Sequence, residues 1–267
     1  MIKDRIKTAF IQFAPLLGNP GLTLNKIQSL LSTLPDVDLI VLPELANSGY
    51  NFTSAEQAFE LSESVLQSDF VDFLTGFAKT RDIVIVTGFN EQEDAKLYNS
   101  SLLITPGGIR GKYRKIHLFM NEKSIFEPGN LGLPVIDVGF CKLGMQICFD
   151  YIFPETWRIL GLKGADIICH PSNLVTPYAH KVLPAQALMN RYYIVTANRI
   201  GTEGDITFSG RSIISDPEGD IILEAPGDSE SVLFADLSLE KARNKNLTAL
   251  NHVYHDRFPE QYKDLGC

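Results

Sequence analysis

The most informative stretch of the chain reads Leu143-Gly144-Met145-Gln146-Ile147-Cys148-Phe149-Asp150-Tyr151-Ile152-Phe153-Pro154-Glu155. It starts as an apolar strand, and Pro154 is suited to the first turn of a helix. Cys148 therefore stands at a strand-to-helix elbow, which projects a nucleophile and points backbone N–H groups at the reacting atom. A cysteine at a strand end is also a common small core residue, so this segment alone leaves both interpretations open.

The segments after this elbow alternate between helix and strand. Apolar spacing predicts a helix over Glu155–Leu162, a strand over Ala165–Cys169, a helix near Leu183–Tyr192 and a strand over Tyr193–Ala197. Three further strands are predicted at Phe208–Ile214, Ile221–Glu224 and Val232–Ala235. A polar tail with aromatic residues follows over residues 244–267.

The segments before the elbow begin with the same alternation. Strands are predicted at Thr8–Phe13, Val37–Leu42 and Ile83–Val86, with helices around Leu24–Leu31 and over Phe59–Thr80 between them. In the middle of the chain, Ser101–Ile104, Val135–Val138 and Leu143–Ile147 read as strands joined by turns, so hairpins are expected there. Many strands and few helices favour an α+β fold, a four-layer α-β-β-α sandwich in which two central sheets are flanked by helices.

The composition is that of an ordinary globular chain. Of 267 residues, 45% are hydrophobic and 21% charged, and no repeat or linker divides the sequence, so we expect one domain over residues 1–267 with 244–267 as its tail. The net charge of -8 gives no electrostatic reason to expect a nucleic-acid partner. No apolar run approaches the ~18 residues of a membrane-spanning helix, so no membrane partner is expected.

The cysteines carry information about the compartment. Cys141, Cys148, Cys169 and Cys267 have no paired C-x-x-C spacing, so neither a zinc site nor a disulfide framework is predicted. We expect free thiols in a reducing compartment, hence a cytoplasmic protein without metal or other cofactor. Apart from Cys148, the cysteines are interpreted as structural or incidental.

A cysteine nucleophile needs a base, because the thiolate is the reactive form. The five histidines, His117, His170, His180, His252 and His255, lie in no recognisable peptidase signature. Glu44 is a better candidate because it ends the apolar run Leu39-Ile40-Val41-Leu42-Pro43, although a carboxylate there could also cap a helix. Lys115 lies in Gly111-Lys112-Tyr113-Arg114-Lys115-Ile116-His117-Leu118-Phe119, where an exposed edge strand is the simpler interpretation.

Together the three segments resemble the nitrilase, or carbon–nitrogen hydrolase, superfamily. Its pattern is a Pro-Glu after a strand, a lysine in Arg-Lys-x-His-Leu, and an elbow cysteine followed by Pro-Glu, and the chain matches in that order. Further similar segments are Gly164-Ala165-Asp166, His170-Pro171-Ser172-Asn173, Ala197-Asn198-Arg199 and Phe208-Ser209-Gly210-Arg211-Ser212. The chain is similar to short single-domain members, archaeal aliphatic nitrilases and small aliphatic amidases. Its Cys148-Phe149-Asp150 differs from the Cys-Trp-Glu of larger nitrilases.

The resemblance implies a catalytic set and a fold. It implies Cys148 as nucleophile, Glu44 as base, Lys115 as the cation that stabilises negative charge, and a second glutamate near the lysine. Glu122 fits that position better than Glu127, which is the alternative. Two central sheets and a homodimer are also implied. Lys112 stays a minor alternative as the cation, and His117 as the base.

The resemblance further implies hydrolysis of small aliphatic nitriles or amides through a Cys148 thioester, giving a carboxylic acid and ammonia. Tyr50, Phe149 and Asn173 are carried over as residues that line the substrate pocket, and His170 as an orienting residue. The first alternative is an N-carbamoyl or ω-amide amidohydrolase. The less favoured alternative is a catalytically silent binding or scaffold protein of the same fold.

Overall fold

Two six-stranded sheets form the centre of the protein. The computed structural model describes residues 3–266, so Cys267 lies outside the described residues. The first sheet has the order β14-β1-β2-β3-β4-β5, made of Ser231–Ser238, Arg5–Gln12, Leu39–Val41, Val84–Glu93, Lys96–Thr105 and Gly108–Arg114. The second has the order β13-β12-β9-β8-β7-β6, made of Ile221–Glu224, Ile213–Ser215, Tyr193–Ala197, Ile167–Pro171, Lys142–Met145 and Val135–Asp137.

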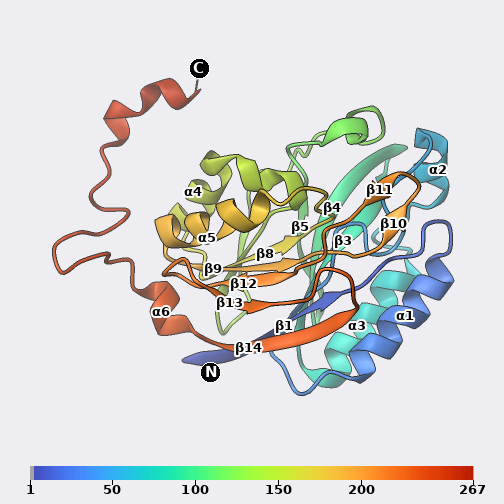
Figure 1. The fold of residues 1–267 in the computed structure, drawn as a ribbon, viewed down its shortest axis with the longest axis horizontal. Coiled ribbons are helices and arrows are strands. Elements are labelled where there is room, and N and C mark those ends of the chain that lie inside the picture. Colours follow the sequence, from blue (N-terminus) through green and yellow to red (C-terminus); the bar gives the residue numbers. More distant parts are fainter. Residues whose placement is uncertain (1–2, 267) are drawn as a thin grey trace.

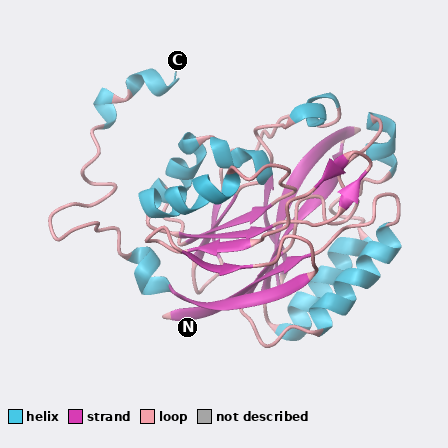
Figure 2. Cartoon of the chain, in the orientation of Figure 1, coloured by secondary structure: helices cyan, strands magenta, loops and turns pink. Residues whose placement is uncertain are grey.

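Helices cover the outer faces of both sheets. Figure 1 shows α1 (Pro20–Ser32) and α3 (Asp69–Arg81) on one side, and α4 (Pro154–Leu162) and α5 (Ala179–Asn190) on the other. In Figure 2 the magenta strands accordingly lie between two groups of cyan helices. The predicted four-layer α-β-β-α sandwich is therefore confirmed.

Strand β2 shows why the sequence folds in layers. Side chains alternate across a strand, and Leu39 and Val41 pack in the core between the two sheets. Ile40 and Leu42 pack in a separate core against α1 and α3. Because both faces are covered, the strand is apolar throughout, as expected for a buried strand with parallel neighbours.

Two predicted elements were wrong in their extent. The helix expected over Phe59–Thr80 is two helices, α2 (Ala55–Glu60) and α3, because the Ser68 hydroxyl accepts the N–H of Val71 and starts a new helix. The strand expected over Phe208–Ile214 is limited to β12, since Gly210 and Arg211 have positive φ values of 55°. A short hairpin, β10 (Thr202–Glu203) with β11 (Ile206–Thr207), precedes it.

The end of the described chain leaves the sandwich. After α6 (Leu239–Arg243), residues 244–266 form a largely irregular arm outside the two sheets, with the 3-10 turns Pro259–Gln261 and Lys263–Gly266 (Figure 1). The arm contacts α5, where the Tyr254 hydroxyl donates to the Asn190 carbonyl oxygen at 2.6 Å. Leu250 in this arm is 91% exposed. Within residues 3–266, no helix combines the length and the apolar character that crossing a bilayer requires.

Gly88 of β3 permits a close approach that shapes the edge of the first sheet. A Cβ atom at Gly88 would lie 2.4 Å from the Cα of Glu44 and 2.5 Å from the carbonyl oxygen of Pro43. The Gly88 N–H donates to that same carbonyl oxygen at 3.0 Å. The glycine therefore lets the backbone at Glu44 pack directly against β3.

Replacing Gly88 with alanine will lower the free energy of unfolding by about 1–3 kcal/mol, the usual cost of overpacking a tight site. Urea unfolding measures this loss. Gly76→Ala is the matched control: an added Cβ there meets nothing within 4 Å, and alanine suits the interior of α3. Equal unfolding midpoints for Gly88→Ala and the wild type would contradict the packing argument.

Candidate active site

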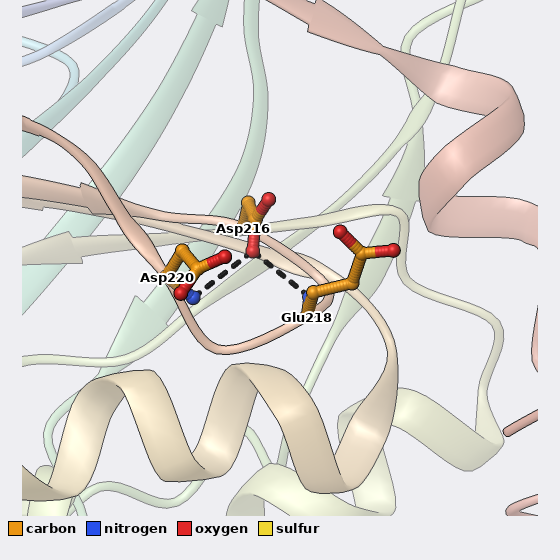
Figure 3. Close-up of side chains that lie close together, drawn as sticks. All are labelled: Asp216, Glu218 and Asp220. Carbon is orange, nitrogen blue, oxygen red and sulfur yellow. Dashed lines mark hydrogen bonds between the residues drawn. The ribbon is translucent and has the colours of Figure 1, made fainter.

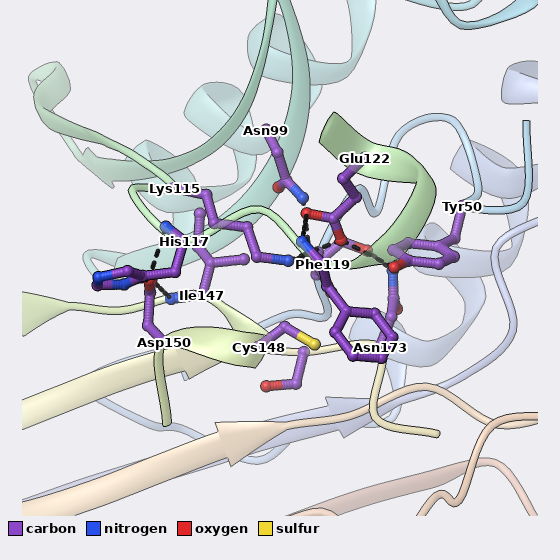
Figure 4. A network of polar contacts seen from close by, with 12 residues as sticks. Tyr50, Asn99, Lys115, His117, Phe119, Glu122, Ile147, Cys148, Asp150 and Asn173 are labelled. Carbon is purple, nitrogen blue, oxygen red and sulfur yellow. Dashed lines mark hydrogen bonds and ion pairs between the residues drawn. The ribbon is translucent and has the colours of Figure 1, made fainter. Parts of the chain in front are cut away.

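Two strand ends and a 3-10 turn bring three predicted residues into one buried cluster. Glu44 follows β2 and Lys115 follows β5, and both are fully buried. Lys115 Nζ lies 2.7 Å from Glu44 Oε1 and 2.7 Å from Glu122 Oε1. Figure 4 shows Lys115 and Glu122 together. Glu122 lies in the 3-10 turn Met120–Ser124, where its Oε2 accepts the N–H of Phe119. One ammonium group thus joins two carboxylates.

Burial and charge act against each other at Lys115. Burial disfavours its charged form, but the carboxylates of Glu122 and Glu44 outweigh this effect and raise its pKa. Burial also raises the pKa of Glu122, and the negative charge of Glu44 raises it further, while Lys115 opposes the rise. Lys115 is therefore a permanent cation, and the cluster favours a proton on one of its acids.

Cys148 is held in a strained elbow after β7. It begins the 3-10 turn Cys148–Ile152 with φ at 42°, in the left-handed region that costs a non-glycine residue roughly 1–2 kcal/mol. Asp150 holds this turn: its Oδ2 accepts the Ile147 N–H at 2.9 Å and the Tyr113 hydroxyl at 2.7 Å. Its Oδ1 lies 2.7 Å from His117 Nδ1. The elbow is thereby tied to β5 and to the residues after it.

The environment of the Cys148 thiol favours its neutral form. Burial raises its pKa, and the charge of Glu44 adds to the rise, whereas Lys115 and the backbone N–H of Asn173 lower it. In Figure 4 the Cys148 sulfur lies below the end of the Lys115 side chain and beside the Phe119 ring. A neutral thiol needs a base before it can attack. Among residues 3–266, Glu44 Oε2 is a buried carboxylate oxygen without a hydrogen-bond partner.

The nearby histidines do not contact the thiol as bases. His170 Nε2 donates to the carbonyl oxygen of Cys148 at 2.9 Å, and its Nδ1 lies 3.1 Å from Thr196 Oγ1. Burial lowers the pKa of His170 to about 4, so the ring is neutral at pH 7. His117 stacks on Phe153 with 3.6 Å between ring centroids. Both rings therefore support the elbow.

The alternative cation and the alternative glutamate lie elsewhere. Lys112 pairs with Glu91 and Glu93 in a network that also includes Arg114. Glu127 donates its backbone N–H to the Leu97 carbonyl oxygen, and its exposed side chain has no contact with Lys115 among the described hydrogen bonds and ion pairs. The structure thus brings Glu122, and not Glu127, to the lysine.

The three predicted pocket residues border this cluster in different ways. The Tyr50 hydroxyl donates to Glu122 Oε1 at 2.8 Å. Asn173 Nδ2 donates to the backbone oxygen of Glu44 at 3.1 Å, and its buried Oδ1 has no partner among residues 3–266. The centroid of the Phe149 ring lies 4.9 Å from that of the Phe119 ring. Tyr50 and Asn173 thus contact the glutamates, whereas Phe149 packs behind Phe119.

A pocket of about 360 Å³ opens beside Glu122. Tyr50 and Glu122 connect it to the buried cluster, and Asp205 lies at its rim on the β10–β11 turn. Its other walls are mainly apolar and include Phe52, Phe119, Ile125, Phe126 and Ile206. A pocket of this size and character suits a small organic molecule with an apolar body.

Two supporting residues were missed by sequence reasoning. Asn99 Nδ2 donates to Glu44 Oε1 at 2.7 Å, and Asp150 holds the elbow. Asp150 could have been suspected because it lies two residues after Cys148. Asn99 carried no local signal: it reaches the site because β4 pairs with β5, which brings its carbonyl oxygen to the N–H of Lys115.

Three acidic side chains lie together in a turn far along the chain from these residues. Asp216, Glu218 and Asp220 lie close together in the turn between β12 and β13 (Figure 3). Asp216 Oδ1 accepts the backbone N–H groups of Glu218 and Asp220 at 2.9 and 3.1 Å, and its Oδ2 pairs with Lys241 at 2.5 Å. Asp216 therefore has a structural role: its hydrogen bonds shape the turn.

Comparison with known proteins identifies sequences and structures that match over nearly the full length. The carbon–nitrogen hydrolase family matches residues 7–246. A nitrilase of Pyrococcus abyssi is 42% identical over 259 residues, which cover 96% of this chain and 99% of that protein. An N-carbamoylputrescine amidase of Arabidopsis thaliana is 32% identical over 253 residues, 85% of this chain and 84% of the relative.

A solved structure agrees with these sequence matches. The carbon–nitrogen hydrolase of Helicobacter pylori G27 superposes with a TM-score of 0.89 at 27% identity, covering 98% of this chain and 99% of that one. The two central sheets and the flanking helices therefore recur together across the whole length of a chain of diverged sequence.

The buried ring of His170 predicts a dependence of stability on pH. The His170 ring has a pKa near 6.5 in the unfolded chain, whereas burial lowers this pKa to about 4 in the folded chain. Stability is therefore fully present above pH 6.5 and is lost as the pH falls toward 4, by at most about 1.4 kcal/mol per pH unit.

Urea unfolding of wild type and His170→Asn at several pH values between 7 and 4 measures this effect. The carboxyl groups titrate in both proteins, so their contribution cancels in the comparison. The wild type should lose stability more steeply than the variant. Parallel curves would show that His170 is not neutral in the folded protein.

Proposed function

The chain belongs to the carbon–nitrogen hydrolase family, and from this premise we propose that it hydrolyses small aliphatic nitriles or amides to a carboxylic acid and ammonia. The family and its nitrilase or amidase type, which three ordered motifs predicted, are confirmed by the match over residues 7–246 and by the relative at 42% identity. One observation supports the proposed chemistry above all: Lys115 Nζ joins Glu44 and Glu122 beside the Cys148 thiol.

In the first step Glu44 takes the thiol proton, and the Cys148 sulfur attacks the electrophilic carbon of the substrate. Glu44 Oε2 is suited to this because its other oxygen already accepts from Lys115 and Asn99. Negative charge then develops on the substrate oxygen or nitrogen, where Lys115 and the backbone N–H of Phe149 stabilise it. In a site that excludes water, one such donor contributes about 3–4 kcal/mol.

In the following steps Glu44 returns its proton to the leaving nitrogen. An amide loses ammonia directly and leaves a thioester on Cys148. A nitrile first forms a thioimidate, which takes up one water and then loses ammonia to give the same thioester. A further water, activated by Glu44, releases the carboxylic acid and restores the thiol.

Glu122 has a positioning role in this scheme. It accepts a second hydrogen bond from Lys115, besides the one to Glu44, and it lines the pocket together with Tyr50. A lysine side chain has four rotatable bonds, and two carboxylates restrain it more firmly than one. Tyr50 and Asn173 are proposed to contact the substrate.

The amide and nitrile activities need the same residues, so the pocket decides between them. The similarity to a nitrilase favours nitriles, and the similarity to an N-carbamoylputrescine amidase keeps an N-carbamoyl or ω-amide substrate as the second candidate. Because the nucleophile must stay a thiol, we propose a reducing, cytoplasmic location. The proposed steps use only side chains, backbone N–H groups and water, so no cofactor is proposed.

A homodimer is also proposed. The outer surfaces of α4 and α5 expose Ile159, Leu162, Leu188 and Met189, each between 38% and 46%. Adjacent exposed apolar side chains of this kind are typical of an interface. Light scattering after size-exclusion chromatography tests this, and a monomer at micromolar concentration would contradict it.

Wild type should release ammonia from one class in a panel of small aliphatic nitriles, dinitriles, ω-amides and N-carbamoyl compounds, and Cys148→Ala should release none. Release from nitriles identifies a nitrilase, and release only from amides or carbamoyl compounds identifies an amidase. Intact-protein mass spectrometry after acid quenching should show an added acyl group on the wild type and not on the variant.

A folded wild-type protein that releases ammonia from no compound in the panel would favour the silent scaffold. Ammonia release that persists in Cys148→Ala would instead remove Cys148 from the mechanism.

Lys115→Met should lower kcat/KM at least a thousandfold and destabilise the fold by about 3–5 kcal/mol, because it leaves Glu44 and Glu122 buried without their cation. Lys112→Met is the matched control: it removes the same charge three residues away, on a side chain that is 21% exposed. Activity assays and urea unfolding measure both variants. A greater loss of activity in Lys112→Met would reverse the choice of cation.

A further inference from the structure

A second buried ion pair lies next to the pocket, outside the catalytic cluster. Arg199 follows β9 and is 1% exposed, and its Nη1 lies 2.7 Å from Oε1 of Glu203 in β10. Such a pair contributes little net stability by itself, because both charges must leave water. The other contacts of Glu203 indicate a more specific purpose.

Glu203 binds the segment that carries Tyr50. Its Oε2 accepts two consecutive backbone N–H groups, from Tyr50 at 3.0 Å and from Asn51 at 2.8 Å. Asn51 Nδ2 donates in turn to the Glu203 backbone oxygen at 2.8 Å. Gly49, with φ at 89°, permits this approach, since a Cβ atom there would lie 2.9 Å from Glu203 Oε1. The Glu203 carboxylate thus fixes the backbone of Tyr50 and Asn51.

Arg199 also restrains the Tyr50 ring, through Phe208. The Arg199 guanidinium lies 4.1 Å from the centroid of the Phe208 ring, and the Tyr50 ring packs edge-on against Phe208 with 5.7 Å between centroids. The Tyr50 hydroxyl then donates to Glu122 Oε1, the oxygen that also accepts from Lys115. A continuous set of contacts therefore leads from Arg199 to Glu122.

We propose that Glu203, held by Arg199, is a positioning residue of the active site: it fixes the Tyr50 segment so that the Tyr50 hydroxyl donates to Glu122. The inference rests on the proposed function, in which Glu122 orients Lys115. It also explains why a buried carboxylate occupies the short β10–β11 hairpin, whose turn forms one wall of the pocket.

A double-mutant cycle between Glu203→Gln and Tyr50→Phe tests the proposal. Each single variant should lower kcat about tenfold, the effect of one weakened hydrogen bond to a charged group. If Glu203 acts through Tyr50, the double variant should also lose about tenfold, because the second change removes an interaction that is already lost. Independent effects would multiply to about a hundredfold and would overturn the proposal.

Asp216→Asn is the matched control. Asp216 is also a buried carboxylate that accepts two backbone N–H groups and pairs with a cation, but it lies in the turn shown in Figure 3. It should change kcat less than twofold. If Glu203→Gln fails to fold, Arg199→Lys enters the same cycle, because it keeps the charge and loses the planar contact with Phe208.

A second measurement needs no substrate. The groups that face the Cys148 thiol are Glu44, Lys115 and Glu122, and the Tyr50 hydrogen bond favours the charged form of Glu122. Loss of that bond makes Glu122 more often neutral, so the thiol ionises more easily. The pH midpoint for alkylation of Cys148 by iodoacetamide, followed on the Cys148 peptide by mass spectrometry, should therefore move to lower pH in Tyr50→Phe.

Glu203→Gln should shift this midpoint in the same direction, and the double variant no further than Tyr50→Phe. An unchanged midpoint in Glu203→Gln, or shifts that add, would overturn the proposal. Because alkylation is independent of turnover, this result is distinct from a wild type that releases no ammonia, which would contradict the proposed function alone.

Discussion

The burial of one ammonium group between two carboxylates is the constraint on which the site depends. Lys115 is fully buried, and Glu44 and Glu122 each lie 2.7 Å from its nitrogen. Charges removed from water are tolerated in a protein only when they are paired at good geometry. The strand ends that carry Lys115 and Glu44 must therefore meet, and the absence of a side chain at Gly88 lets the Glu44 backbone reach that position.

The same cluster determines the state of the Cys148 thiol. Because burial and Glu44 keep this thiol neutral, the proposed mechanism needs a carboxylate that takes its proton when substrate is present. The elbow keeps the sulfur beside the cluster at the cost of a strained φ, and Asp150 holds that conformation through three partners. His170 adds a bond to the Cys148 carbonyl oxygen. Packing and charge thus oppose thiolate formation in the resting protein.

Two further ion networks border the site, and they differ in what they hold. Glu91 of β3 pairs with Lys112 and Arg114 of β5, the strand that leads into Lys115. Glu203, with Arg199, connects the pocket wall to the Tyr50 segment. Since β5 leads into Lys115, the first network stabilises the backbone that carries the lysine, and the second stabilises one wall of the pocket.

The sequence by itself determined most strands and helices and the layered α-β-β-α fold, because apolar periodicity is a local signal. Local signals made Cys148, Glu44 and Lys115 candidates, and only the resemblance of three ordered motifs to a known family selected them as a set. It placed Glu122 before Glu127 only through resemblance. The tertiary structure alone decided that Asn99 bonds Glu44 and that Glu203 holds Tyr50. Those contacts join segments far apart in the chain, and the pairing of strands, not the local pattern, brings such side chains together.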